Sequence, residues 1–187
     1  LNGGGDNSLN TNVITQIIEH PKINQKGKFF VIIGRRTFSA CQNFVNELDT
    51  YTNVTFVGEP TGENINFFGD VNFITLPNSK IAASLSFAWW QNKAPWDTRE
   101  WMPPHHSVEL TFADYVENRD PVLASIWTLK PEDIIDPMAH IMSLFQQGKM
   151  KELAQVASSY IQDPKYQYVP FLDHFLRGGK ALINNGQ

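Results

Sequence analysis

A chain of 187 residues, 42% of them hydrophobic, is long enough for one domain with an appendage and short for two full domains. No apolar run approaches the roughly 20 residues that span a bilayer, which excludes a transmembrane helix in this sequence. The net charge is −4 and only Arg35 and Arg36 form a basic pair, which excludes a basic stripe for nucleic acid. The single cysteine, Cys41, excludes an internal disulfide and multi-cysteine metal sites.

Helices and strands alternate with short links in the first 60 residues, after a glycine cluster at Gly3–Gly5. The periodicity predicts a helix over 9–20, a strand over 29–33, a helix from Ser39 to Tyr51 and a strand over 54–58. The β-branched and aromatic run over 29–33 is typical of a strand that is covered on both faces. This order predicts a parallel α/β sheet.

The middle of the chain changes to alternating apolar and polar residues. That pattern predicts two antiparallel strands, over 72–77 and 80–90, with Asn78 and Ser79 in the turn. An irregular stretch at 91–104 follows, and then an edge strand over 107–112 and a short helix over 120–129.

Beyond Pro131 the pattern is helical only, with expected helices over 134–147, 152–161 and 168–183. We therefore divide the chain into a sheet domain, 1–130, and a helical appendage, 131–187. The segment 145–166 is similar to a single tetratricopeptide-type hairpin. A helical appendage packed on the sheet domain explains the same pattern, because one such hairpin cannot build a solenoid. Either arrangement offers a surface for a partner or a second protomer.

Ser39 lies where a predicted buried strand turns into an amphipathic helix. The free N–H groups and the positive dipole end of a helix start favour negative charge, as an acyl-transfer enzyme requires at the attacked carbonyl. Ser39 is therefore a candidate nucleophile. A capping box, with Ser39 bonded to the N–H of Gln42 and Gln42 reaching back, explains the same spacing.

Six segments occur in order over residues 1 to about 128: NGGGDN at 2–7, TFSA at 37–40, FVGEPTG at 56–62, LPNS at 76–79, DTREWMPP at 97–104 and VELTFADYVENRDPVL at 108–123. Together they resemble the serine peptidase family of C-terminal-processing (tail-specific) proteases and the tricorn core protease. The resemblance implies an α/β fold with a ClpP/crotonase-like core and a mixed sheet. It also implies Ser39 as the nucleophile and an oxyanion hole from the N–H groups of Gly4, or Gly3, and Ala40. No metal or organic cofactor is implied. The sequence leaves the location open, and the resemblance alone favours an extracytoplasmic (periplasmic or secreted) one.

The base that activates Ser39 is not evident from this sequence. One branch of the family uses a lysine about 25 residues after the serine, but residues 62–66 contain none. The tricorn-type branch uses an upstream histidine and an acidic residue some 60 positions after the serine. Because the sequence starts at a leucine, we expect a fragment or processed product whose histidine lies upstream. Asp97 is our choice for the acid, with Glu100 as the alternative. Both acids also fit a solvated loop or a partner for Arg99.

Several other residues carry two interpretations each. Thr61 and Gly62, after the second strand, are candidate substrate-binding residues because ligands gather at the carboxyl ends of parallel strands. Glu59 and Asp70 belong to the same turn-rich segment. The pair His105-His106 is a poor metal site, since adjacent strand residues point to opposite faces. His20, which closes a helix before a proline, fits the helix dipole better than a catalytic base. The tryptophans of 89–101 suit either a cleft or packing of the loop.

These patterns favour a serine endopeptidase that acts on a peptide or protein through an acyl-enzyme on Ser39. Two alternatives remain open. One is an inactive relative that binds peptides or apolar ligands in the same cleft. The other is a scaffold whose helical tail mediates assembly while Ser39 only caps its helix.

Overall fold

The computed structural model of the chain describes residues 3–172 and 175. Its body contains a three-stranded parallel sheet with the strand order β1-β2-β5. The strands are β1 (Phe30–Ile33), β2 (Thr55–Gly58) and β5 (His106–Ser107). In the register of the first pair, Ile33 lies opposite Gly58, so both strands end at the same edge of the sheet. The predicted α/β class is confirmed at this level.

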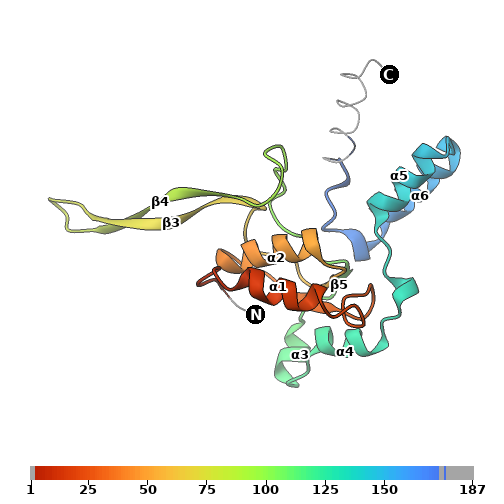
Figure 1. Cartoon of the computed structure of the whole chain (residues 1–187), viewed down its shortest axis with the longest axis horizontal. Coiled ribbons are helices and arrows are strands. Elements are labelled where there is room, and N and C mark those ends of the chain that lie inside the picture. The colour runs from red at the N-terminus through yellow and green to blue at the C-terminus, as the bar shows by residue number, and fades with distance from the viewer. Residues whose placement is uncertain (1–2, 173–174, 176–187) are drawn as a thin grey trace, which may run out of the picture.

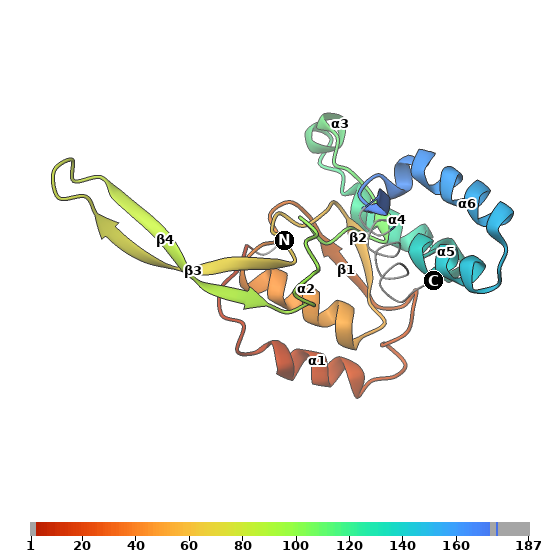
Figure 2. The same ribbon diagram turned by 90° about the horizontal axis from the view of Figure 1, so that it is seen from above.

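Two helices lie side by side on one side of this sheet (Figures 1 and 2). They are α1 (Asn10–Ile18) and α2 (Ala40–Tyr51). Apolar side chains from both helices, from β1 and β2, and from the loop before β5 form the main core. It includes Ile14, Ile33, Leu48, Phe56 and Met102. The helix α2 connects β1 to β2, as the strand and helix periods predicted.

The outer strands of the sheet differ from the prediction. Among residues 3–172 and 175, β1 is an edge strand with one neighbour, and 38% of Ile32 remains exposed, so the expectation of a strand covered on both faces is wrong. The predicted edge strand over 107–112 is reduced to the two residues of β5. Thr111 ends that segment because its side chain accepts a hydrogen bond from the Asp114 N–H and caps α3 (Phe112–Val116).

Residues 66–91 form a long two-stranded antiparallel hairpin, which we call the arm (Figures 1 and 2). Its strands are β3 (Asn66–Thr75) and β4 (Ala82–Gln91). The two antiparallel strands were predicted, although β3 begins six residues earlier than expected. In the described part of the chain the arm and the parallel sheet are separate sheets, so the mixed sheet of our prediction does not form.

After the helix α4 (Pro121–Thr128) the chain is helical, as predicted. Two antiparallel helices lie at the end of the molecule opposite the arm (Figure 1), flanked by 3₁₀ turns at Pro131–Asp133 and Pro164–Tyr166. They are α5 (Pro137–Gln146) and α6 (Met150–Gln162), and they share a small core that includes Ile141 and Tyr160. Of the expected helix over 168–183, residues 171, 172 and 175 are helical, and most of the remainder lies outside the described residues.

Among the residues that the structure describes, none of the helices is both long enough and apolar enough to cross a membrane.

Candidate active site

Ser39 lies in the tight turn between β1 and α2, in a backbone conformation that L-residues rarely adopt. Its φ is 57° and its ψ is −131°. Such a conformation costs on the order of 1–3 kcal/mol and persists only where surrounding structure holds it. Ser39 occupies the position before the first residue of α2, yet its side chain makes no capping hydrogen bond. The capping-box interpretation is therefore wrong, and the half-buried hydroxyl is left for another role.

The glycine loop at the N-terminus lies against this turn. A Cβ atom built on Gly4 would lie 2.9 Å from Ser39 Cβ and 3.4 Å from Ser39 Oγ, and the Gly4 φ is +114°. Both the space and the backbone conformation thus require glycine. The loop and the serine are 35 positions apart in sequence, and their contact is the juxtaposition that an oxyanion hole of Gly4 and Ala40 needs. Ala40 is the first residue of α2, so its N–H has no acceptor within the helix.

The Ser39 turn is fastened to the loop that follows β2. The Gly62 N–H donates to the Thr37 carbonyl over 3.0 Å. A Cβ atom on Gly62 would lie 2.1 Å from the Arg35 carbonyl oxygen, so only glycine permits this approach. On the other side, the Gly34 N–H donates to Thr37 Oγ1 over 3.3 Å. Gly62 therefore serves the backbone geometry of the site.

Glu63 is the acidic residue that this fastening brings to the serine. Burial raises the pKa of the Glu63 carboxyl above its usual range, while hydrogen bonds from the backbone N–H groups of Ser39 and Asn64 oppose that rise. Glu63 was not among the predicted site residues, because the family pattern at residues 62–66 calls for a lysine. The available signal was an acidic residue near the expected position of that lysine, 24 positions after Ser39.

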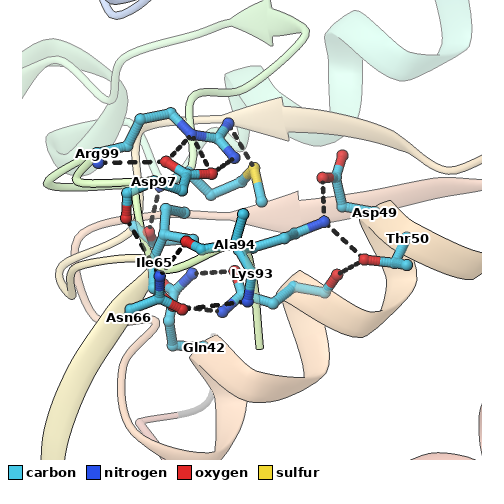
Figure 3. Close-up of polar contacts among 12 residues, drawn as sticks. Gln42, Asp49, Thr50, Ile65, Asn66, Lys93, Ala94, Asp97 and Arg99 are labelled. Atoms are coloured by element: carbon cyan, nitrogen blue, oxygen red, sulfur yellow. Dashed lines mark hydrogen bonds and ion pairs between the residues drawn. The ribbon is translucent and has the colours of Figure 1, made fainter. Parts of the chain in front are cut away.

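Asp97 forms a bidentate ion pair with Arg99 (Figure 3). Arg99 Nε lies 2.9 Å from Asp97 Oδ1 and Arg99 Nη2 lies 2.7 Å from Asp97 Oδ2. Each side chain is only 17% exposed. The partner for Arg99 that we gave as an alternative role is thus present, and a catalytic role of Asp97 stays a prediction. Glu100, the other acidic candidate, is exposed.

A buried polar network joins α2 to the segments around Asp97 (Figure 3). Gln42 Nε2 donates to Asn46 Oδ1 over 2.9 Å, and Asn46 Nδ2 donates to the Ile65 carbonyl over 2.7 Å. The Ile65 N–H in turn donates to the Arg99 carbonyl over 3.1 Å. Gln42 and Asn46 are completely buried. Because Gln42 points along α2 into this network, it is not available for the reciprocal half of a capping box.

Two more contacts attach the irregular stretch 91–104 to the body. Lys93 Nζ donates to Asp49 Oδ2 over 2.7 Å and to Thr50 Oγ1 over 2.6 Å (Figure 3). Trp101 Nε1 donates to the Tyr168 carbonyl over 3.0 Å, which supports the packing interpretation of this tryptophan. The loop is therefore anchored on both sides of Asp97.

Thr61 is buried, and its Oγ1 accepts a hydrogen bond from the Met102 N–H over 2.8 Å. The backbone pairs in the opposite sense, since the Thr61 N–H donates to the Met102 carbonyl over 3.2 Å. These contacts assign Thr61 a structural role, and substrate binding by Thr61 stays a prediction. Glu59 forms an ion pair with Arg35 at 3.1 Å, beside the Ser39 turn. Asp70 lies in the arm, where its carboxylate accepts from Trp90 Nε1 over 3.1 Å.

His105 and His20 have structural partners, whereas the buried Nδ1 of His106 has none among the described residues. His105 stacks on the Phe56 ring, and its Nδ1 accepts a hydrogen bond from the Phe56 N–H over 2.9 Å. Burial lowers the pKa of His105 and of His106. His20 Nδ1 lies 2.6 Å from the Gln16 carbonyl oxygen near the end of α1. Within residues 3–172 and 175, no three or more His, Cys, Asp or Glu side chains are grouped as metal ligands would be.

No protein-family model matches this chain, and no curated protein sequence matches it significantly. We therefore infer function from the geometry around Ser39. The turn combines a serine in a strained conformation, a glycine loop in contact with it, a helix start and a nearby carboxyl group.

Proposed function

We propose that this chain carries the nucleophile of a serine peptidase of the tail-specific and tricorn type, on a ClpP/crotonase-like core. The observation that carries the proposal is the conformation of Ser39. The residue holds the position of a helix cap, in a strained backbone conformation, without using its hydroxyl as a cap. Strain of this kind gathers at functional sites, and a nucleophilic serine in a tight turn between strand and helix is a known way to expose Oγ.

In the proposed reaction Ser39 Oγ attacks the carbonyl carbon of a peptide bond while a base takes the hydroxyl proton. The negative charge that develops on the carbonyl oxygen is stabilised by the N–H groups of Gly4 and Ala40, each worth roughly 3 kcal/mol in such a site. The C–N bond then breaks, the amine leaves with the proton from the base, and water hydrolyses the Ser39 ester. No metal or organic cofactor takes part.

The base in this proposal is a histidine from outside the printed sequence, as the family resemblance implies. Glu63 supplies the nearby carboxyl group. The Ser39 backbone N–H donates a hydrogen bond to it, which opposes the rise of its pKa on burial. We assign Glu63 the role of orienting or polarising the site, which we had given to Asp97. The bidentate pairing of Asp97 with Arg99 supports this change.

A fluorophosphonate probe tests the proposal on the full-length protein. The probe forms a bond from phosphorus to an activated serine oxygen and releases fluoride. We expect labelling that disappears in Ser39→Ala and persists in Ser158→Ala, a matched change at an exposed serine of α6. If the wild-type protein is folded and unlabelled, or if Ser39→Ala still labels, the peptidase assignment is wrong.

A second function, binding of peptides without cleavage, is favoured by one observation. The best sequence candidate for the acidic catalytic residue, Asp97, is engaged by Arg99. A binding module predicts that peptides associate equally well with the wild-type protein and with Ser39→Ala, and that neither variant reacts with the probe. Calorimetric titration of both variants with a peptide library fraction separates the two functions.

A further inference from the structure

We propose that the arm is a homodimerisation element, in which the apolar faces of two arms pack against each other in antiparallel orientation. This inference goes beyond the peptidase proposal and does not depend on it. It concerns residues 66–91, which extend away from the body (Figures 1 and 2).

The cross-strand register sorts the arm into two unlike faces. Leu85, Phe87 and Trp89 alternate along β4 and share one face. Their partners across the hairpin bring Phe68 opposite Trp89 and place Ile74 opposite Ala83 on the same face. We call these five large residues the apolar face. The rings of Phe68 and Trp89 pack with their centroids 4.7 Å apart.

The opposite face is built mainly from small residues. It carries Gly69, Ala82, Ser84, Ala88 and Ser86 beside the larger Val71, Phe73 and Trp90. The faces therefore differ in what they offer a partner. The first offers a row of large side chains along β4, with the polar Asn72 between Phe68 and Ile74 on β3, and the second offers small side chains with isolated large ones.

All five residues of the apolar face are exposed, including Phe68 at 66% and Phe87 at 62%. A two-stranded hairpin is marginal in water unless a further layer covers its hydrophobic face. An aromatic side chain presents roughly 150–250 Å² when it is fully exposed, and the five residues of the face keep between 42% and 66% of their surface exposed. Full cover of the face therefore gives a contact at the low end of specific interfaces, which suits a reversible dimer.

The base of the arm is fixed to the body, which presents this face in a defined direction. Asn66 Nδ2 donates to the Ala94 and Asp97 carbonyls over 3.0 and 3.2 Å, and Asn66 Oδ1 accepts from the Lys93 N–H over 3.1 Å. Phe67 beside it is buried. A pre-oriented arm loses less freedom on association than a mobile one.

The charges of the arm indicate a second copy as the partner. Residues 66–91 contain two charged side chains, Asp70 toward the base and Lys80 at the tip. These cancel, so the arm as a whole does not attract nucleic acid or an anionic lipid surface. When two arms lie antiparallel about a two-fold axis, the tip of each meets the base of the other. That arrangement brings Lys80 of each copy toward Asp70 of its partner, and it is self-complementary, as a two-fold contact must be.

Sedimentation of the full-length protein over a range of concentrations tests this proposal. We expect a reversible dimer in which Phe87→Lys raises the dissociation constant at least about tenfold, the effect of losing roughly 1.4 kcal/mol. The matched control is Phe73→Lys, which places the same charge on the opposite face at a residue that is 80% exposed. The control leaves the dissociation constant within about threefold, since surface changes outside a contact have small effects.

Two single-cysteine variants keep the test decisive if Phe87→Lys does not fold. Cys41→Ser removes the single native cysteine, and Leu85→Cys then adds one on the apolar face near the middle of the arm. Mild oxidation gives a disulfide-linked dimer with Leu85→Cys and little with Ser84→Cys, which lies on the other face. A protein that stays monomeric at all concentrations overturns the proposal. So does equal crosslinking from both faces. A monomer whose arm becomes protected from hydrogen exchange only after an extended peptide is added overturns it in favour of a peptide partner.

Discussion

The Ser39 turn and the arm lie in the same chain, yet the turn buries polar side chains while the arm exposes apolar ones. Around the turn, the polar side chains of Gln42 and Asn46 are completely buried and joined by a hydrogen bond from Gln42 Nε2, although Gln42 Oε1 has no partner in the described part of the chain. Along the arm, Phe68 and Phe87 are mostly exposed on a hairpin that extends away from the body (Figures 1 and 2).

The Ser39 turn is therefore held in place by contacts inside the protein. The apolar face of the arm, in contrast, needs a partner to cover it. A buried polar network stabilises one arrangement strongly, because each broken bond leaves an unpaired group inside the protein. An exposed apolar face has no such internal constraint and gains free energy only when it is covered. We therefore expect substitutions near the turn to act on folding and those on the outer arm to act on association.

The largest effect on folding is expected from Gly62→Ala. The added Cβ would lie 2.1 Å from the Arg35 carbonyl oxygen, so the loop after β2 must move away from the Ser39 turn. We expect a loss of about 3 kcal/mol in the free energy of unfolding, at the upper end for overpacking. Gly5→Ala is the control, because it adds backbone strain at a φ of +143° in open space. Urea denaturation that finds equal losses for both variants would disprove the close approach.

Asn46→Ala comes next, with an expected loss of about 2 kcal/mol. Removal of the amide leaves Gln42 Nε2 and the Ile65 carbonyl unpaired in the interior. The exposed Asn12 of α1 provides the comparison, and Asn12→Ala should change the free energy of unfolding by less than about 0.5 kcal/mol. Equal stability of Asn46→Ala and wild type in urea titrations would mean that the network contributes nothing.

Asp97→Asn is expected to cost about 1.5 kcal/mol, the low end for hydrogen bonds to a charged group, because asparagine keeps one acceptor oxygen. Arg99→Lys removes the bidentate geometry from the other side, and the double variant should lose less than the sum of the two single changes. Such coupling in a thermal or urea denaturation cycle is the signature of a structural ion pair. If the two losses add, or if Asp97→Asn abolishes probe labelling at unchanged stability, Asp97 has a catalytic role instead.

The smallest effect is the pH dependence that Glu63 causes. The pKa of Glu63 is raised in the folded protein, so the folded state holds its proton more tightly than the unfolded chain does. The stability from this group is therefore complete below its unfolded pKa and is lost as pH rises through the higher folded value. Glu63→Gln lacks that dependence. Between about pH 4 and 7, the free energy of unfolding of the wild type should fall relative to Glu63→Gln by less than about 1 kcal/mol.

Exposed Glu132 supplies the matched control, and Glu132→Gln should keep the pH dependence of the wild type. A wild-type protein that gains stability relative to Glu63→Gln as pH rises would contradict the direction of the Glu63 shift.

The sequence was sufficient for elements that depend on local periodicity. The positions of α1, α2, β1 and β2 follow from apolar spacing, and the cap of α4 follows from Asp120 before Pro121. Gly4 lies against Ser39, and the oxyanion hole that the family resemblance implies for it stays a prediction.

What depends on distant partners was not predictable in the same way. Ser39 and Gln42 have the spacing of a capping box, but the tertiary bond from Gln42 to Asn46 and the strained Ser39 backbone override it. The choice of Glu63 over Asp97 as the acidic residue of the site required the fold. Arg99 pairs with Asp97 in one loop, whereas the Ser39 N–H reaches Glu63 in another. Alternation in β3 and β4 indicated strands without telling whether another sheet covers them.

The central claim is that the Ser39 hydroxyl attacks a carbonyl carbon, and the acylation of the full-length protein by a p-nitrophenyl ester measures this directly. We expect a burst of p-nitrophenol close to one equivalent per protein, with the acyl group located on Ser39 by fragment mass spectrometry. An adduct on the neighbouring Cys41, or a folded protein that shows neither burst nor adduct, would contradict it.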